Sequence, residues 1–147
     1  MISCTHVTEQ TNHQGTKTRS EPIPKETDKV ASKIVDAAFA VHTTLGPGLL
    51  ESVYEACLLH ELQKRSLRAE RQGLLPVVYD GLRLDSGLRL DLVVDNLVVV
   101  ELKAVDMLLP VHKAQMLTYL KLSGHRLGLL VNFNSVLIKD GIHRIAL

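Results

Sequence analysis

The stretch Val98-Val99-Val100-Glu101-Leu102-Lys103-Ala104 decides the fold, because it reads as a core strand and still carries two charges. Side chains alternate across a strand, so Glu101 and Lys103 share one face. Upstream, Asp91 interrupts a second apolar run, Leu90-Asp91-Leu92-Val93-Val94. Burying a charge costs several kcal/mol, roughly, unless the charge is paired or holds a metal. Two apolar strands that each contain an acid therefore predict a metal site built on a sheet.

The loop between these strands decides whether the two acids meet. The strands are expected at Arg89–Val94 and Leu97–Ala104, as a hairpin around Asp95-Asn96. A two-residue loop would pair Asp91 with Val100 and place Asp91 on the face away from Glu101. Convergence requires an odd number of loop residues, or a bulge. Because Asn96 tolerates left-handed backbone angles, we predict a three-residue loop or a similar irregularity.

Length and composition favour one domain inside the cell. The chain has 147 residues, is 46% hydrophobic with 3% aromatics, and carries a formal net charge of +1, which is low for a dedicated, tight nucleic-acid binder. Its two cysteines, Cys4 and Cys57, form no disulfide or zinc pattern. We find no signal-peptide pattern and no apolar run of the roughly 20 residues that span a bilayer. A cytoplasmic protein without a membrane partner is expected.

The pattern along the chain predicts a mixed α/β domain over residues 26–147, preceded by a flexible polar tail over residues 1–25. Helices are expected from Thr27 or Asp28 to the turn Gly46-Pro47-Gly48, over Leu49–Ser66, and over Pro110–Leu122. Besides the central hairpin, strands are expected at Leu74–Tyr79, Leu82–Leu84 and Leu127–Val131, and Val136–Lys139 with Ile142–Ile145 as a final hairpin around Asp140-Gly141.

Three short motifs carry a family resemblance. Asp91 followed by Glu101-Leu102-Lys103 resembles the D…ExK core of the PD-(D/E)XK nuclease superfamily. Gly48-Leu49-Leu50-Glu51-Ser52-Val53-Tyr54 matches the pattern that names the GxxExxY proteins within it, and Gln115-Met116-Leu117-Thr118-Tyr119 resembles the QxxxY helix motif of its exonuclease-like branch. The motifs stand in the family's order on the expected elements. The resemblance implies a restriction-endonuclease-like core, αβββαβ, flanked by helices and here extended by a C-terminal hairpin.

The resemblance also implies roles for individual residues. Asp91, Glu101 and the Leu102 carbonyl would hold Mg²⁺ or Mn²⁺, since Mg²⁺ prefers carboxylate and water oxygens. Lys103 would stabilise hydroxide or the charge that develops on phosphorus. The remaining catalytic candidates are Glu51 and Gln115, and the substrate-binding candidates are Tyr119, Arg89 and Tyr54.

Some of these residues could instead have purely structural roles. Glu101 and Lys103 could form a surface ion pair of little energetic weight. The helix dipole stabilises an acid at position 51 whether or not that acid takes part in chemistry. Tyr54 could serve packing as well as catalysis, and the basic run Lys64, Arg65, Arg68 and Arg71 could be a solvated helix end rather than a phosphate grip.

The function that these residues favour is metal-dependent hydrolysis of phosphodiester bonds in nucleic acid. DNA is the preferred expectation for the substrate, and RNA is the second. The alternative is a non-catalytic module on a nuclease scaffold that binds nucleic acid or protein, and a protein partner stays open. The sequence does not distinguish DNA from RNA, endonuclease from exonuclease, or one oligomeric state from another.

Overall fold

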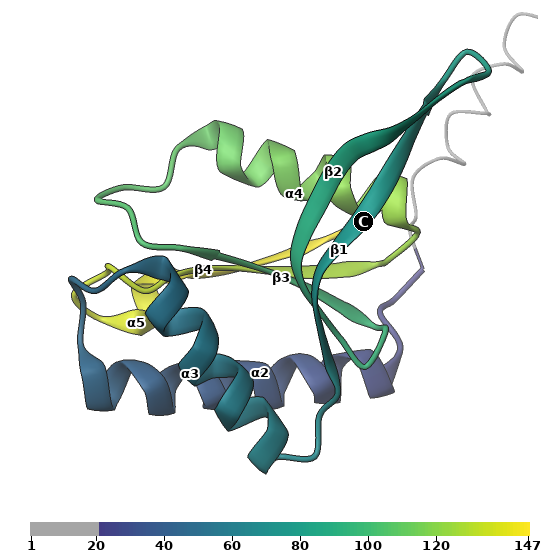
Figure 1. Ribbon diagram of the computed structural model, residues 1–147. Coiled ribbons are helices and arrows are strands. Elements are labelled where there is room, and N and C mark those ends of the chain that lie inside the picture. Colours follow the sequence, from purple (N-terminus) through teal and green to yellow (C-terminus); the bar gives the residue numbers. More distant parts are fainter. Residues whose placement is uncertain (1–20) are drawn as a thin grey trace, which may run out of the picture.

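The computed structural model describes residues 21–147, so most of the predicted tail 1–25 lies outside the described part. A five-stranded sheet runs through the domain, with helices on both of its faces (Figure 1). The helices are α2 (Lys25–Leu45), α3 (Glu51–Lys64), α4 (Pro110–Ser123) and the short α5 (Ile138–Gly141). The strands are β1 (Ala69–Tyr79), β2 (Leu82–Val94), β3 (Val98–Lys103), β4 (Leu127–Asn132) and β5 (Ile142–Ala146).

The sheet order β1-β2-β3-β4-β5 gives the predicted mixed topology. β1, β2 and β3 pair antiparallel, α4 connects β3 to a parallel β4, and β5 returns antiparallel to β4. The elements from α3 to β4 therefore form the αβββαβ core. The main hydrophobic core packs α2 and α3 against one face of the sheet, and a smaller cluster around Met116 and Leu120 of α4 covers the other. The predicted fold class is confirmed.

The helices on the first face follow from the apolar periodicity, but their ends differ from the prediction. α2 begins at Lys25 after Pro24, so Thr27 and Asp28 lie inside its first turn and do not cap it. The turn between α2 and α3 does depend on glycine, since Gly46 and Gly48 have positive φ values of 70° and 99°. These two residues reverse the chain so that α3 begins at Glu51.

The hairpin between β2 and β3 has the predicted three-residue loop. Val94 pairs with Val98, and Asp95, Asn96 and Leu97 form the connection, with positive φ at Asp95 (51°) and Asn96 (55°). The Leu97 N–H closes the loop on the Val94 carbonyl at 2.9 Å. This register places position 91 opposite position 101, so the two acids share one face, as the sequence required.

β1 and β2 extend far beyond the rest of the sheet as a two-stranded ribbon, which we call the arm (residues 74–89; Figure 1). Its tip is the predicted tight turn, with positive φ at both Asp80 (49°) and Gly81 (81°). The register shifts between Leu75 and Val77, where three residues of β2 lie opposite the single residue Pro76. β2 is therefore one strand with an irregularity, and not two strands separated by a break.

The predicted C-terminal hairpin is wrong in its first half. Val136 and Leu137 are exposed and form no strand, and Ile138–Gly141 is a helical turn. The reason lies at Gly141, where an added Cβ would come within 2.5 Å of the Asn132 carbonyl at the end of β4. Asp140-Gly141 thus packs the chain closely against β4 instead of turning a hairpin, and β5 pairs with β4.

Candidate active site

The candidate site lies where β2 leaves β3. The backbone ladder between these strands ends at the pair Leu92 and Val100, and beyond it β2 continues into the arm. Side chains replace the missing ladder bonds: the Leu102 N–H donates to Asp91 Oδ2 (3.0 Å), and the Asp91 N–H donates to Glu101 Oε1 (3.3 Å). Each carboxylate is thereby fixed by the opposite strand, and the two acids of the D…ExK pattern are brought together.

Burial and mutual repulsion make this pair of carboxylates costly to ionise. Glu101 is only 8% exposed, and its burial, together with the charge of Asp91, raises its pKa to about 7. Burial also raises the pKa of Asp91, although the hydrogen bond from Leu102 opposes this change. The repulsion acts on Glu101, because the group that ionises second meets a charge already present. Such desolvated acids are typical of functional sites.

Lys103 supplies positive charge at this site. It is half-buried on β3, on the face of Glu101, and its ammonium favours the ionised forms of Glu51, Asp91 and Glu101. The chain beyond Lys103 is held by Asn132, a buried residue of β4. Its amide accepts from the Val105 N–H (3.0 Å) and donates to the Val105 carbonyl (2.9 Å). These bonds fix the end of the strand that carries Lys103.

Glu51 reaches the site from the first turn of α3. Partial burial raises the pKa of Glu51, and the charge of Asp91 raises it further, so the two carboxylates are electrostatic neighbours. Tyr54, expected to bind substrate, has no surface exposed to a substrate in this structure. Its hydroxyl donates to the Gly46 carbonyl (2.6 Å) and accepts from the Leu49 N–H (3.1 Å). Tyr54 therefore holds the turn that places Glu51.

Sequence reasoning missed Glu55, which lies one helical turn after Glu51 and so on the same face of α3. Its side chain is 13% exposed, and its charge raises the pKa of Asp91. Glu55 Oε2 is buried without a hydrogen-bond partner among the described residues, although Arg71 Nε of β1 lies 3.5 Å away as an ion pair. The i, i+4 spacing from Glu51 was the signal that could have revealed it.

α4 closes the site on the side of the smaller hydrophobic cluster. Tyr119 is half-buried there; burial raises its pKa, and the charges of Glu101 and Asp91 raise it further, so its phenol lies within electrostatic reach of the paired acids. Gln115 is exposed one turn earlier on the same side of the helix. His112 has a structural contact, since its Nδ1 accepts from the Leu109 N–H (3.0 Å) at the start of α4. Tyr119 is thus the α4 residue that the structure brings to the acids.

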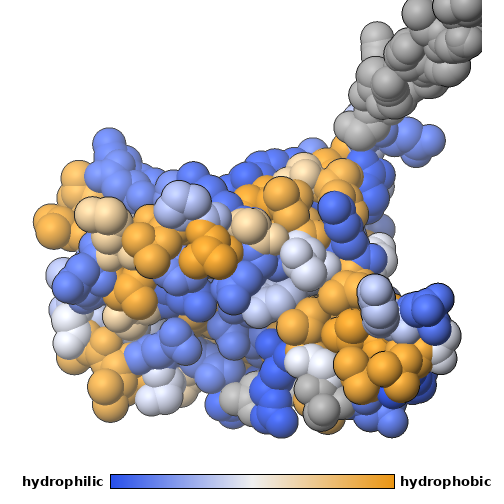
Figure 2. Space-filling view, turned by 90° about the horizontal axis from the view of Figure 1, so that it is seen from above, coloured by the Kyte–Doolittle hydropathy of each residue, from blue (hydrophilic) through white to orange (hydrophobic). Residues whose placement is uncertain are grey.

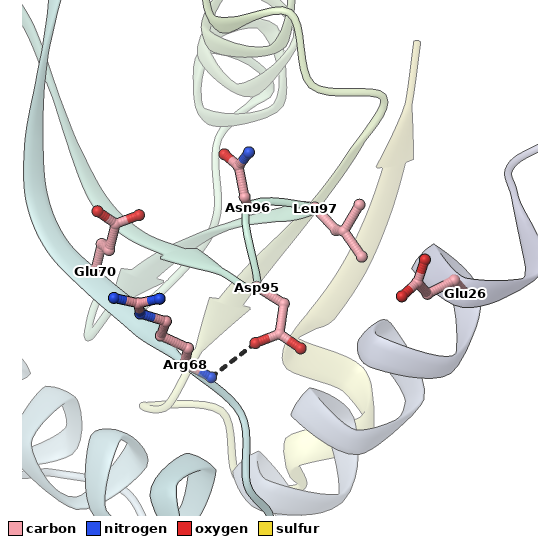
Figure 3. A pocket seen from close by; sticks show the side chains of 6 residues that line it. All are labelled: Glu26, Arg68, Glu70, Asp95, Asn96 and Leu97. Atoms are coloured by element: carbon pink, nitrogen blue, oxygen red, sulfur yellow. Dashed lines mark hydrogen bonds between the residues drawn. The ribbon is translucent and has the colours of Figure 1, made fainter.

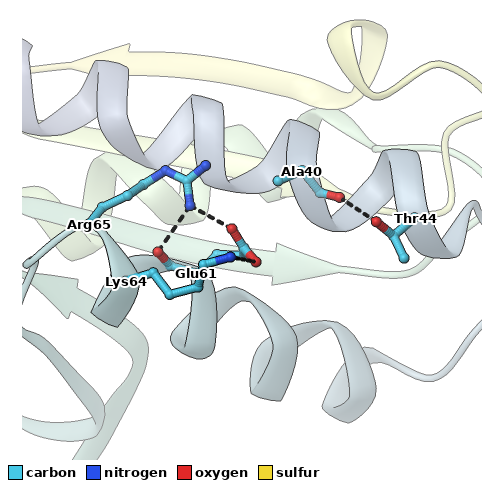
Figure 4. Close-up of polar contacts among 5 residues, drawn as sticks. All are labelled: Ala40, Thr44, Glu61, Lys64 and Arg65. Carbon is cyan, nitrogen blue, oxygen red and sulfur yellow. Dashed lines mark hydrogen bonds and ion pairs between the residues drawn. The ribbon is translucent and has the colours of Figure 1, made fainter.

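The predicted basic cluster does not form one surface. Lys64 and Arg65 form ion pairs with Glu61 on their own helix, at 3.3 and 2.6 Å (Figure 4). Arg71 pairs with Glu55 at the candidate site. Arg89 is exposed on β2, two residues before Asp91, where β2 enters the arm.

One cavity of the described part of the chain lies away from these residues. It has a volume of about 550 Å³ and is formed by Glu26, Arg68, Glu70, Asp95, Asn96 and Leu97. Figure 3 shows Asp95 accepting a hydrogen bond from the Arg68 backbone N–H, at 2.7 Å. This hydrogen bond supports the hairpin turn. Asp95 lies at the loop end of β2, three ladder pairs away from the acids, so the cavity is separate from the candidate site.

Among residues 21–147, no three acidic, His or Cys side chains form a ready-made metal cluster. Proteins usually bind Mg²⁺ through one or two carboxylates plus water and substrate phosphate oxygens. Asp91, Glu101 and the carbonyl of Leu102 offer such a partial set at an edge that β2 leaves open. No helix in the described part of the chain is long and apolar enough to cross a membrane.

A mixed sheet that brings an aspartate and an ExK strand together at a splayed hairpin defines a nuclease-like scaffold of the restriction-endonuclease type. Residues 28–145 match the family described as the PD-(D/E)XK nuclease superfamily, and the chain belongs to that superfamily. A search of curated proteins found no match. The chain is similar in fold to the structure described as "Crystal structure of SSO0001", with 20% identity, a TM-score of 0.50, and coverage of 99% of this chain and 78% of that one.

Proposed function

We propose that this protein is a metal-dependent nuclease that hydrolyses phosphodiester bonds in nucleic acid, with DNA as the first expected substrate and RNA as the second. The observation that carries the proposal is the pair Asp91 and Glu101, fixed on opposite strands by each other's backbone beside Lys103. Such a pair destabilises the fold, because its members are desolvated and repel each other. A function at this site would explain why the chain carries it.

The donor set fits a hard divalent cation, Mg²⁺ or Mn²⁺. Asp91, Glu101 and the Leu102 carbonyl would hold the ion, since all three offer oxygen atoms. The Oε2 of Glu55, which has an ion pair with Arg71 but no hydrogen bond among the described residues, adds to a local negative charge that Lys103 and Arg71 balance only in part. When bound, such a cation lowers the pKa of a coordinated water and neutralises phosphate charge.

The chain's own residues perform the remaining tasks. Lys103 would place its ammonium beside the phosphate oxygens and offset the charge that develops there. Glu51, from α3, would accept a hydrogen bond from the attacking water and orient it. Tyr119 and Gln115 of α4 would position the phosphate, and Arg89 would contact the nucleic acid at the entrance to the arm.

We further propose membership of the GxxExxY group, because its pattern has a physical role at each named position. Gly48 has a φ of 99°, which other residues rarely adopt, and so allows the turn into α3. Glu51 faces the paired acids. The Tyr54 hydroxyl bonds the turn on both sides of Gly48. The three residues thus act together to deliver one carboxylate to the site.

Cleavage of labelled DNA and RNA, single- and double-stranded, with Mn²⁺ tests the proposal. Asp91→Asn and Lys103→Met should each lower the cleavage rate by roughly 100-fold or more, as expected for removal of charge that stabilises a transition state. Asp85→Asn is the matched control, because Asp85 is an exposed aspartate on the same strand, paired with Arg83. Its rate should equal that of the wild type.

Calorimetric titration with Mn²⁺ separates the nuclease from its alternative. Binding that disappears in Asp91→Asn and persists in Asp85→Asn supports the metal site. Nucleic-acid binding without Mn²⁺ binding and without cleavage would refute the nuclease proposal and leave a non-catalytic module on a nuclease scaffold.

A further inference from the structure

One face of the arm carries three cross-strand pairs of apolar side chains. Residues opposite each other in an antiparallel pair share a face, and the pairs are Leu75 with Leu88, Val77 with Leu84, and Tyr79 with Leu82. Alternation along β1 puts its three members on the same side. We call these six residues the apolar face of the arm. The opposite face carries Leu74, Val78, Arg83 and Arg89, so the two faces differ in charge.

Much of this apolar face is open to solvent. Tyr79 is 72% exposed and Leu82 58%, and Leu84 is also exposed, while the three residues nearer the base are partly covered. Figure 2, which looks down on the molecule from above, shows hydrophobic residues gathered over the arm at the lower right. An isolated two-stranded ribbon is marginally stable in water, because it lacks a second layer to pack against. The arm therefore has the composition of a surface that is covered in the working protein.

The chemistry of the face indicates what covers it. Nucleic-acid binding depends on cations that meet phosphates, and none of the six side chains is charged. The arginine at the tip, Arg83, is already paired with Asp85 at 2.7 Å. Addition of a further strand at the edge of β1 would meet Pro76, which has no N–H to donate. The mode that the face itself offers is packing against another uncharged surface.

We propose that the apolar face of the arm packs against the same face of a second copy of this chain, forming a two-fold dimer. An apolar, uncharged surface can pack against a copy of itself, and two-fold pairing of identical patches is the commonest form of association. The six side chains expose a few hundred Å² on each copy. Two such faces approach the roughly 1,000 Å² of the smallest specific interfaces, so a weak dimer that forms as the concentration rises is expected.

Dimerisation would also bear on the candidate site, because Asp91 is on the same strand as the arm. The segment from Leu88 to Asp91 joins the interface to the paired acids without a break in β2. The proposal does not depend on nuclease activity, and the test requires none.

Sedimentation velocity of the full chain, from about 5 to 200 µM, tests the proposal. The wild type should move from one chain of 16.3 kDa toward twice that mass as its concentration rises. Leu82→Glu and Val78→Glu form a matched pair, since the residues are 58% and 59% exposed on opposite faces of the arm. Leu82→Glu should weaken the dimer by roughly 100-fold, because a charge would be buried in each copy. Val78→Glu should leave the association unchanged.

Circular dichroism spectra and melting curves establish that each variant is folded, and Leu84→Glu repeats the test at a second position of the face. A wild type that stays monomeric at 200 µM would overturn the proposal. So would equal weakening by Leu82→Glu and Val78→Glu, since the interface would then not be the apolar face. A monomer whose Leu82→Glu variant loses oligonucleotide binding would assign the face to substrate instead.

Discussion

Replacing Glu101 by Gln should make the metal-free protein more stable and abolish the proposed nuclease activity. The pKa of Glu101 is about 7 in the folded protein, against an ordinary value of 4.5, because the carboxylate is buried beside Asp91. The difference of about 2.5 units, at about 1.4 kcal/mol per unit, corresponds to about 3 kcal/mol of folding free energy lost when Glu101 ionises. Gln keeps the oxygen that accepts from the Asp91 N–H and carries no charge.

The sign of the pH dependence follows from proton binding. Between pH 4.5 and about 7 the folded protein binds more protons at Glu101 than the unfolded chain does. The free energy of unfolding of the wild type should therefore fall as the pH rises through this range and level off above it. Glu101→Gln should match the wild type near pH 4.5 and exceed it by about 3 kcal/mol at about pH 8.5.

Urea denaturation in EDTA, followed by circular dichroism at about pH 5, 6.5 and 8.5, measures this difference. Glu61→Gln is the control, because Glu61 is paired with Lys64 and Arg65 and its pKa is lowered by their hydrogen bonds. That variant should lose a little stability, equally at the two higher pH values. Adding Mn²⁺ should stabilise the wild type and leave Glu101→Gln unchanged. A Glu101→Gln protein that is less stable than the wild type by the same amount at every pH would refute the reasoning.

Three further variants test how the site is held. Deleting Asn96 would shorten the hairpin loop to two residues and turn Asp91 to the opposite face, so Mn²⁺ binding measured by calorimetry should disappear; retained affinity would contradict the register argument. Tyr54→Phe removes two hydrogen bonds from the turn before α3 and should cost about 1–3 kcal/mol in urea denaturation, a loss that an unchanged midpoint would disprove. Asn132→Ala removes both hydrogen bonds to Val105 and should lower the free energy of unfolding by a similar amount, about 1–3 kcal/mol. It should also lower kcat and leave KM little changed. A normal kcat would show that these two hydrogen bonds do not position Lys103.

The central hairpin was predictable because its constraints were all local. The period of two along each strand assigned faces, and the requirement that two acids meet excluded an even loop. Asn96 supplied the left-handed conformation that an odd loop needs, and the structure has it. The Asp80-Gly81 turn was predictable for the same reason, since both residues accept positive φ.

What could not be predicted depends on contacts between distant segments. Tyr54 looked equally suited to packing and chemistry, and only the fold shows it stacked on Phe133 with a centroid distance of 4.7 Å. The last apolar run resembled a hairpin, but Gly141 must pass close to Ser135 and Asn132, which no local pattern reveals. Glu55 was overlooked because its importance comes from Asp91 on another element.

One feature of the backbone, the departure of β2 from β3 at Asp91, accounts for the site and the arm together. A complete ladder between these strands would pair the backbone of Leu102 with β2 and leave no room for carboxylates between the strands. Because β2 turns away, Asp91 and Glu101 take over those hydrogen bonds, and the edge beside Leu102 stays open to a cation and a phosphate. The same departure carries the rest of β2 into solvent, where its apolar face is left without a second layer. Site and arm are therefore two consequences of one bend, and a change that closed the ladder would be expected to remove both.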